Sequence, residues 1–288
     1  MFLTICIDNL FLRNKQENRV PQIRHTLATP EKSLFLQVES SLVKMMIKAI
    51  ICDADDTLWS NEPLFRNAEQ HCFEILKEYG TPEWLNAELY RTETDNMEEL
   101  GYGAKAFILS MIETAVRVSG GKISAEKILR LEQTGRAILR NPATPLDGVE
   151  ETLTSLRQTG RYELAILTKG ELLDQNNKID RSGLRKHFDY VDVVNEKTPE
   201  VYSELCARLE IRPEEMVMVG NSFKSDIDPV LKIGGKGVYI PSPMTWQHEI
   251  VEEYEHPGLY RADTFKELPE ILETIQNKTK WKLHDFGK

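Results

Sequence analysis

Residues 47–59 read IKAIICDADDTLW, an apolar run that ends at three aspartates, Asp53, Asp55 and Asp56. The β-branched and small apolar residues of the first half predict a strand that is buried on both faces. Three carboxylates within four residues repel one another, so placing them together is costly unless a cation compensates. Because side chains alternate along a strand, Asp53 and Asp55 point in related directions and offer oxygen donors that suit Mg²⁺. A solvated acidic turn is the alternative interpretation of these residues.

Four further short apolar runs predict buried strands, at residues 162–167, 190–194, 216–219 and 237–240. Helical patterns lie between these runs, at residues 171–186, 199–209 and 225–233. Strands that alternate with helices form a parallel sheet with right-handed crossovers. We therefore expect an α/β fold, a Rossmann-like parallel sheet with helices on both faces, in which ligands bind at the carboxyl ends of the strands.

The stretch from residue 63 to residue 143 differs, because it shows helical periodicity and no convincing strand pattern. Glycines separate the expected helices, which run over residues 64–79, 83–99, 103–119 and 124–140. Ser124 suits the N-cap of the last helix. Since the block lies between the first two strands, we expect a helical cap domain (63–143) inserted into a core formed by residues 46–62 and 144–288.

Composition excludes several classes of protein. The 288 residues include 36 Lys plus Arg and 46 Asp plus Glu, a formal net charge of -10 without a basic stripe. That balance argues against nucleic-acid binding, and no apolar run approaches the ~18 residues that a membrane span needs. The four cysteines have no metal-binding spacing and suit small buried side chains in the reducing cytoplasm. Residues 1–45 lack steady periodicity and are expected to form a poorly ordered N-terminal extension; no oligomeric state is indicated.

Polar residues also follow the other predicted strands. Thr168 follows the second strand, Lys197 the third, and Asn221 with Asp226 the fourth. Taken alone, each has a plain structural interpretation: a helix-capping hydroxyl, a solvated lysine, and a turn that leads into a helix. Their shared position at the carboxyl ends of parallel strands indicates one common site instead.

The order and spacing of these clusters resemble the four motifs of the haloacid dehalogenase superfamily, over roughly residues 46–260. The motifs are matched, in order, by Asp53-Ala-Asp-Asp-Thr57, by Thr168, by Lys197, and by Gly220-Asn-Ser222 with Asp226. The first motif, with its Leu-Trp continuation, is the specific one, and the others gain weight from their order. The helical block between the first two motifs resembles the C1 cap of that family.

The resemblance implies a Mg²⁺-dependent phosphatase that acts on a small phosphorylated metabolite. Asp53 would be the nucleophile that forms an aspartyl-phosphate, and Asp55 would protonate the leaving alkoxide and then activate water. Thr168 and Lys197 would hold the phosphate oxygens. The implied metal ligands are Asp53, Asp55, Asn221 and Asp226.

One position departs from the family pattern, because Asn221 stands where an Asp metal ligand is usual. An amide oxygen binds Mg²⁺ without a negative charge, so we expect weaker metal binding. A phosphomutase of the same fold and a catalytically silent binding relative are the alternative functions. A true dehalogenase is a third, against which Asp55 counts, because those enzymes typically lack the second aspartate. The substrate is not indicated, although five residues of the helical block are candidates for facing the site: Asn96, Glu99, Tyr102, Lys105 and Arg136.

Overall fold

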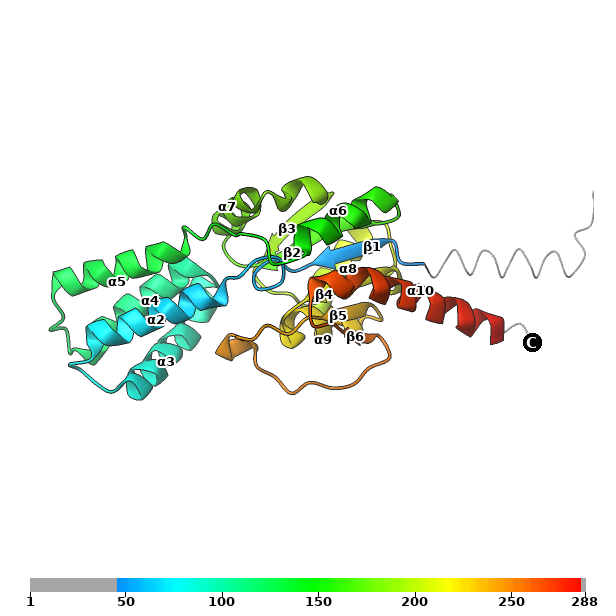
Figure 1. The fold of residues 1–288 in the computed structure, drawn as a ribbon. Coiled ribbons are helices and arrows are strands. Elements are labelled where there is room, and N and C mark those ends of the chain that lie inside the picture. The colour runs from blue at the N-terminus through cyan, green and yellow to red at the C-terminus, as the bar shows by residue number, and fades with distance from the viewer. Residues whose placement is uncertain (1–45, 286–288) are drawn as a thin grey trace, which may run out of the picture. The chain divides into compact units, whose positions relative to one another are not determined.

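The computed structural model describes residues 46–285, with side chains through residue 278. The predicted N-terminal extension, residues 1–45, lies outside the described residues. Within them, one six-stranded parallel sheet forms (Figure 1) from β1 (Ala49–Cys52), β2 (Glu163–Lys169), β3 (Tyr190–Val194), β4 (Met216–Gly220), β5 (Lys236–Tyr239) and β6 (Leu259–Arg261). The strand order is β3-β2-β1-β4-β5-β6, so β1 lies between β2 and β4.

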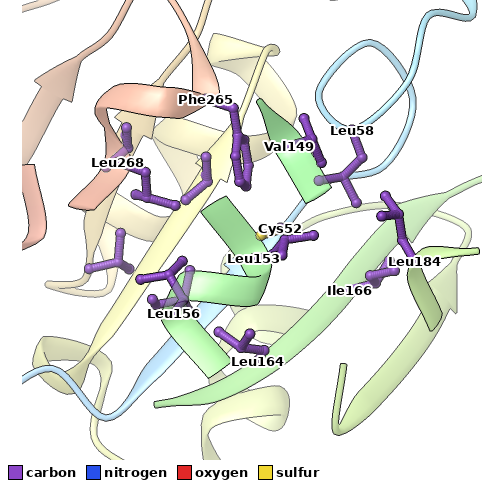
Figure 2. Packing of buried hydrophobic residues seen from close by; sticks show 14 of the residues in the cluster. Cys52, Leu58, Val149, Leu153, Leu156, Leu164, Ile166, Leu184, Phe265 and Leu268 are labelled. Carbon is purple, nitrogen blue, oxygen red and sulfur yellow. The ribbon is translucent and has the colours of Figure 1, made fainter. Parts of the chain in front are cut away.

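Each face of the sheet carries its own hydrophobic cluster, because side chains alternate along every strand. On one face, Ile50 and Cys52 pack with α6 (Val149–Thr159), α7 (Leu172–Ser182) and α10 (Leu268–Asp285), as Figure 2 shows for α6 and α10. On the other face, Ala49 and Ile51 pack with α8 (Pro199–Arg208) and with Val230 of α9 (Asp228–Lys232). The predicted α/β sheet with helices on both faces is confirmed.

Some boundaries differ from the sequence prediction. The helix expected over residues 171–186 ends at Ser182, because Gly183 takes a left-handed φ of 71° and a 3₁₀ turn follows. The helix expected over residues 225–233 begins with a π-helical turn, Phe223–Ile227. Strand β6 was not predicted, because its three residues are partly exposed and form no apolar run.

The helical block consists of α2 (Glu62–Leu76), α3 (Pro82–Leu100), α4 (Ala104–Val118) and α5 (Ala125–Ile138). Each helix agrees with its predicted range to within one turn. Ser124 caps α5 as expected, since its hydroxyl accepts a hydrogen bond from the N–H of Lys127 at 3.2 Å. The four helices share a hydrophobic cluster of their own, apart from the two clusters of the sheet. That the block acts as a cap domain stays a prediction.

Two connections join the helical block to the sheet, and they are hydrogen-bonded to each other. The amide nitrogen of Asn141 donates to Ser60 O at 3.0 Å and to Asn61 Oδ1 at 3.3 Å. Arg181, on α7, donates to Asn141 O at 2.7 Å. The entry and exit of the block are therefore held together just beyond the aspartates that follow β1.

Two expectations from the sequence concern the cysteines and the absence of a membrane span. Cys52, Cys72 and Cys206 are buried free thiols, as predicted, and Cys6 lies outside the described residues. Among residues 46–285, no helix has both the length and the apolar character needed to cross a membrane.

Candidate active site

The predicted site residues meet around one cavity at the carboxyl ends of the strands. β1 is in register with both neighbours, so that Cys52 pairs with Ile166 of β2 and with Val219 of β4. The polar residues that follow therefore emerge at the same level. The cavity has a volume of about 160 Å³, and all six predicted site residues line it: Asp53, Asp55, Thr168, Lys197, Asn221 and Asp226.

Lys197 lies at the centre of the charged part of the site. Its ammonium nitrogen is 2.5 Å from Asp53 Oδ1 and 2.7 Å from Asp226 Oδ1, and all three side chains are buried. Burial alone would lower the pKa of Lys197, but the carboxylates of Asp226 and Asp53 outweigh it and raise that pKa. The two carboxylates therefore favour the charged form of this lysine inside the site.

Asp226 has a partner in the protein for each of its carboxylate oxygens. Oδ1 faces Lys197, and Oδ2 accepts a hydrogen bond from the N–H of Ser222 at 2.9 Å. Gly220 makes this packing possible, because a Cβ at that position would lie 2.2 Å from Asp226 Oδ2. This close approach brings Asp226 against the end of β4.

Asn221 lies where three oxygen atoms of the first motif converge. The end of its amide group is 3.1 Å from Asp55 O, 3.3 Å from Asp53 Oδ2 and 3.1 Å from Thr57 Oγ1. The first two atoms only accept hydrogen bonds, so the amide nitrogen is the atom turned toward them. Thr57 in turn donates to Asp53 Oδ2 at 3.0 Å and so links the two ends of the loop.

This donor set fits a hard divalent cation. Asp53 offers a carboxylate oxygen, Asp55 its main-chain carbonyl, and Asn221 an amide oxygen once its amide group turns over, and Mg²⁺ prefers such oxygens. Among the described residues, no group of three or more His, Cys, Asp or Glu side chains could hold a metal ion. The candidate set differs from such a group because only one of its three donors is a side-chain carboxylate.

Asp55 has a different orientation from Asp53. Its carboxylate turns toward α7, where Lys178 approaches both of its oxygens at 2.8 and 2.6 Å. Gln175 Nε2 and Trp59 Nε1 each donate to it at 2.8 Å. The two predicted catalytic carboxylates are thus bound by different lysines.

Asp56, the third aspartate, supports the start of the helical block. It takes a left-handed φ of 60°, and its carboxylate accepts hydrogen bonds from the N–H groups of Asn61 and Glu62 at 2.8 and 3.0 Å. Burial raises the pKa of Asp56 to about 7, against the effect of these two bonds. Burial also raises the pKa of Glu62 to about 8, with Arg66 opposing the shift and Asp56 adding to it. The first turn of α2 therefore begins on a half-buried acid, Asp56, and a buried one, Glu62.

Sequence reasoning missed several residues around the cavity. Lys178 escaped because an Asp174–Lys178 spacing of four is typical of a surface ion pair on a helix, yet this lysine is 3% exposed. Lys169 pairs with Glu249, and its ammonium lies 4.2 Å from the ring centre of Tyr102. Glu249 belongs to the loop after β5, which carries no motif that could have revealed it.

Apolar side chains also line the cavity. Phe65 and Tyr102 come from the helical block, and Met244 and Trp246 come from the loop after β5. The rings of Tyr102 and Trp246 meet edge to face at 5.7 Å. Of the five candidates in the helical block, Tyr102 alone lines this cavity. Lys105 pairs with Glu171, Arg136 with Glu132, and Asn96 lines a smaller neighbouring cavity.

Comparison with known proteins gives consistent results. Residues 47–234 match the family model of the haloacid dehalogenase-like hydrolases. A haloacid dehalogenase-like family hydrolase from Xanthomonas campestris superposes with a TM-score of 0.74 at 33% identity, over 82% of this chain and 94% of that one. The glyceraldehyde 3-phosphate phosphatase of Methanothermobacter thermautotrophicus is 25% identical over 79% of this chain and its own full length. Human N-acylneuraminate-9-phosphatase is 30% identical over 47% of this chain and 54% of its own.

Proposed function

This chain belongs to the haloacid dehalogenase-like hydrolase family, and on that premise we propose that it is a phosphatase that forms an aspartyl-phosphate on Asp53. The observation that carries the proposal is the contact of Asp53 with the buried ammonium of Lys197 at the edge of a cavity. A nucleophilic carboxylate needs a fixed direction and a positive charge for the incoming phosphate oxygens. The names of the phosphatase relatives support the same reaction class.

In the first step, a carboxylate oxygen of Asp53 attacks phosphorus, and the bond from phosphorus to the leaving-group oxygen breaks. Asp55, which enters this step protonated, gives its proton to that oxygen and becomes the carboxylate, so the leaving group departs as an alcohol. Thr168, which is buried and lines the same cavity as Asp53, would donate its hydroxyl hydrogen to a phosphoryl oxygen. Lys197 would contact a second phosphoryl oxygen and oppose the charge that collects there.

In the second step, water hydrolyses the intermediate. Asp55 takes a proton from the water molecule, whose oxygen attacks phosphorus while the bond to Asp53 breaks. Inorganic phosphate leaves, and Asp53 is free again. Splitting the reaction into two displacements replaces one difficult step with two easier ones.

The charge balance of the cavity supports a requirement for Mg²⁺. Seven carboxyl side chains and three lysines line it, so a phosphate would meet an excess of negative charge. Bound Mg²⁺ would neutralise charge on the phosphate oxygens and bring them toward the attacking carboxylate. Asp53, the carbonyl of Asp55 and the amide of Asn221 would hold the ion. Asp226, whose two oxygens contact Lys197 and the N–H of Ser222, would compensate the charge of Lys197 instead of binding the metal. We expect weak binding, because Asn221 adds no charge.

The leaving group would lie against the wall that the helical block and the loop after β5 form. A cavity of about 160 Å³ has room for roughly ten water-sized groups. That volume favours a compact phosphorylated metabolite, such as a triose phosphate, over a long-chain or polymeric substrate. We propose that the helical block acts as a cap that excludes water and selects the leaving group.

A phosphate-release assay tests the proposal. Purified protein is incubated with a panel of phosphorylated metabolites, including glyceraldehyde 3-phosphate, with and without Mg²⁺. We expect free phosphate with at least one compact substrate, in a Mg²⁺-dependent manner and without a bisphosphate activator. Isomerisation of the substrate without phosphate release would indicate a phosphomutase, and the absence of any reaction across the panel would favour a silent relative.

A further inference from the structure

Helix α7 turns polar side chains toward the interior of the molecule. Asp174, Gln175 and Lys178 are 6%, 3% and 3% exposed, although all three residue types are ordinarily found at the surface. Burying a lysine is costly unless a partner compensates, so its position demands an explanation. The motifs of the sequence assign no role to these residues.

The partner is the carboxylate of Asp55. Lys178 Nζ lies 2.8 Å from Oδ1 and 2.6 Å from Oδ2, and Gln175 Nε2 donates to Oδ2 at 2.8 Å. Trp59 Nε1 donates to Oδ1 at 2.8 Å. Three donors thus fix both oxygens of one carboxylate, and Gln175 is itself fixed by donating to Lys169 O at 3.1 Å.

The site gives each of its two principal carboxylates a separate cation. Asp53 contacts Lys197, which comes from the loop after β3, and Asp55 contacts Lys178, which comes from α7. Both aspartates and both lysines line the cavity. Among the described residues, Lys178 is the cation paired with Asp55, which lies only two residues after Asp53 in the chain.

We propose that Lys178 is a positioning residue, which holds the carboxylate of Asp55 at the place where the leaving-group oxygen departs. This role rests on the proposed phosphatase function. Lys178 exchanges no proton in it: the O–H bond of Asp55 breaks as the phosphorus–oxygen bond to the leaving group breaks, while the ammonium keeps its contact. Gln175 and Trp59 help to hold the same carboxylate through their hydrogen bonds to it.

The leaving group provides the test. Lys178→Met removes the charge and keeps most of the stem, and it is compared with wild type on p-nitrophenyl phosphate and on an alkyl phosphate such as glycerol phosphate. Alkoxide departure needs a well-placed proton donor, so we expect kcat for the alkyl ester to fall about 10²-fold. The nitrophenolate leaves without a proton, so its kcat falls far less. Lys178→Arg restores part of the alkyl activity.

Two kinetic outcomes would overturn the role. Equal losses of kcat on both esters would show that Lys178 serves only the fold. A rise in KM on both, with kcat unchanged, would show that it binds substrate rather than positioning Asp55. Lys186→Met is the matched control, because Lys186 is exposed, pairs with Glu150 and does not line the cavity.

A double-mutant cycle on melting temperature gives a readout that needs no substrate. Lys178→Met and Asp55→Asn are measured singly and together, and we expect the double variant to lose clearly less than the sum of the two. Additive losses in an active enzyme would overturn the Lys178 role alone. If wild type releases no phosphate from these esters or from any member of the metabolite panel, the proposed function is wrong, and the positioning role falls with it.

Discussion

The ammonium of Lys197 lies 2.5 Å from Oδ1 of Asp53, with both side chains buried at the carboxyl end of β1. The same ammonium contacts Asp226, so one lysine serves two carboxylates. The ammonium that would bind a phosphoryl oxygen therefore also compensates the negative charges of Asp53 and Asp226. Substitutions of Asp53 and of Lys197 should therefore have different effects, the first on phosphate release and the second on the free energy of unfolding.

Asp53→Asn should abolish turnover and leave the fold intact. An amide is nearly the same size as the carboxylate but is a poor nucleophile, and Lys197 keeps Asp226 as a partner. We expect phosphate release to fall by at least roughly 10³-fold, with a small change in melting temperature. Asp180→Asn, an exposed aspartate paired with Arg185, is the control. Near-native release by the Asp53 variant would rule out the covalent mechanism.

Lys197→Met should destabilise the protein, because it leaves Asp53 and Asp226 buried without their cation. Removing one partner from a buried ion pair costs about 3–5 kcal/mol. Urea unfolding at neutral pH measures this loss, and Lys186→Met again provides the exposed comparison. A second substitution, Asp226→Asn, should recover part of the stability. A loss no larger than that of the control would mean that solvent reaches these groups.

Asn221→Asp should lower the Mg²⁺ concentration needed for half-maximal activity, because it adds a negative charge beside Asp53 and Asp55 O. At saturating Mg²⁺, kcat should change little. Without Mg²⁺ the new carboxylate would lie beside Asp53 Oδ2 and Asp55 O, which both repel it, so the melting temperature should fall and Mg²⁺ should restore it.

Titration of Mg²⁺ by calorimetry and by melting temperature checks both parts of the Asn221 prediction. Asn67→Asp, at an exposed position on α2, serves as the control. An unchanged metal dependence would exclude Asn221 as a ligand. Binding of Mg²⁺ by the variant alone would favour the silent relative.

Glu62→Gln should make the protein less sensitive to alkaline pH. Burial raises the pKa of Glu62 from its ordinary value of 4.5 to about 8, so its favourable contribution is complete below pH 4.5 and is lost as pH rises through about 8. Gln cannot ionise, so the variant should gain stability relative to wild type between pH 6 and pH 9. Melting curves at several pH values measure this gain, with the exposed Glu74→Gln as control. A constant difference across the range would contradict the shift.

Most of the fold could be predicted because its strands and helices are marked by patterns within short stretches of sequence. The runs that became β1 to β5 are short and apolar, and each is followed by polar residues that the parallel sheet brings to one edge. The helices of the inserted block carry ordinary periodicity and caps. Strand β6 has no such signal, because three partly exposed residues pair only after β5 is in place.

The site could be predicted by position but not by orientation. All six predicted residues line the cavity, yet nothing in the spacing of Asp53 and Asp55 shows that their carboxylates take different lysines. That depends on how α7 packs against the loop after β1, more than a hundred residues away in sequence. Lys178 carries no local sign of burial for the same reason.

The central place of β1 has a consequence for the order in which the molecule can be made. Ala49 pairs with Glu163 on one side and with Met216 on the other, so β1, the first of the described strands to be synthesised, gains both neighbours only when most of the chain exists. Such distant pairings form slowly and leave strand edges exposed in the meantime. A ribosome-bound fragment that ends before Asp226 would carry the three aspartates of the first motif without the residues that complete their surroundings. Such a nascent chain would be inactive and prone to aggregate, and the enzyme would mature late, after its last third has emerged.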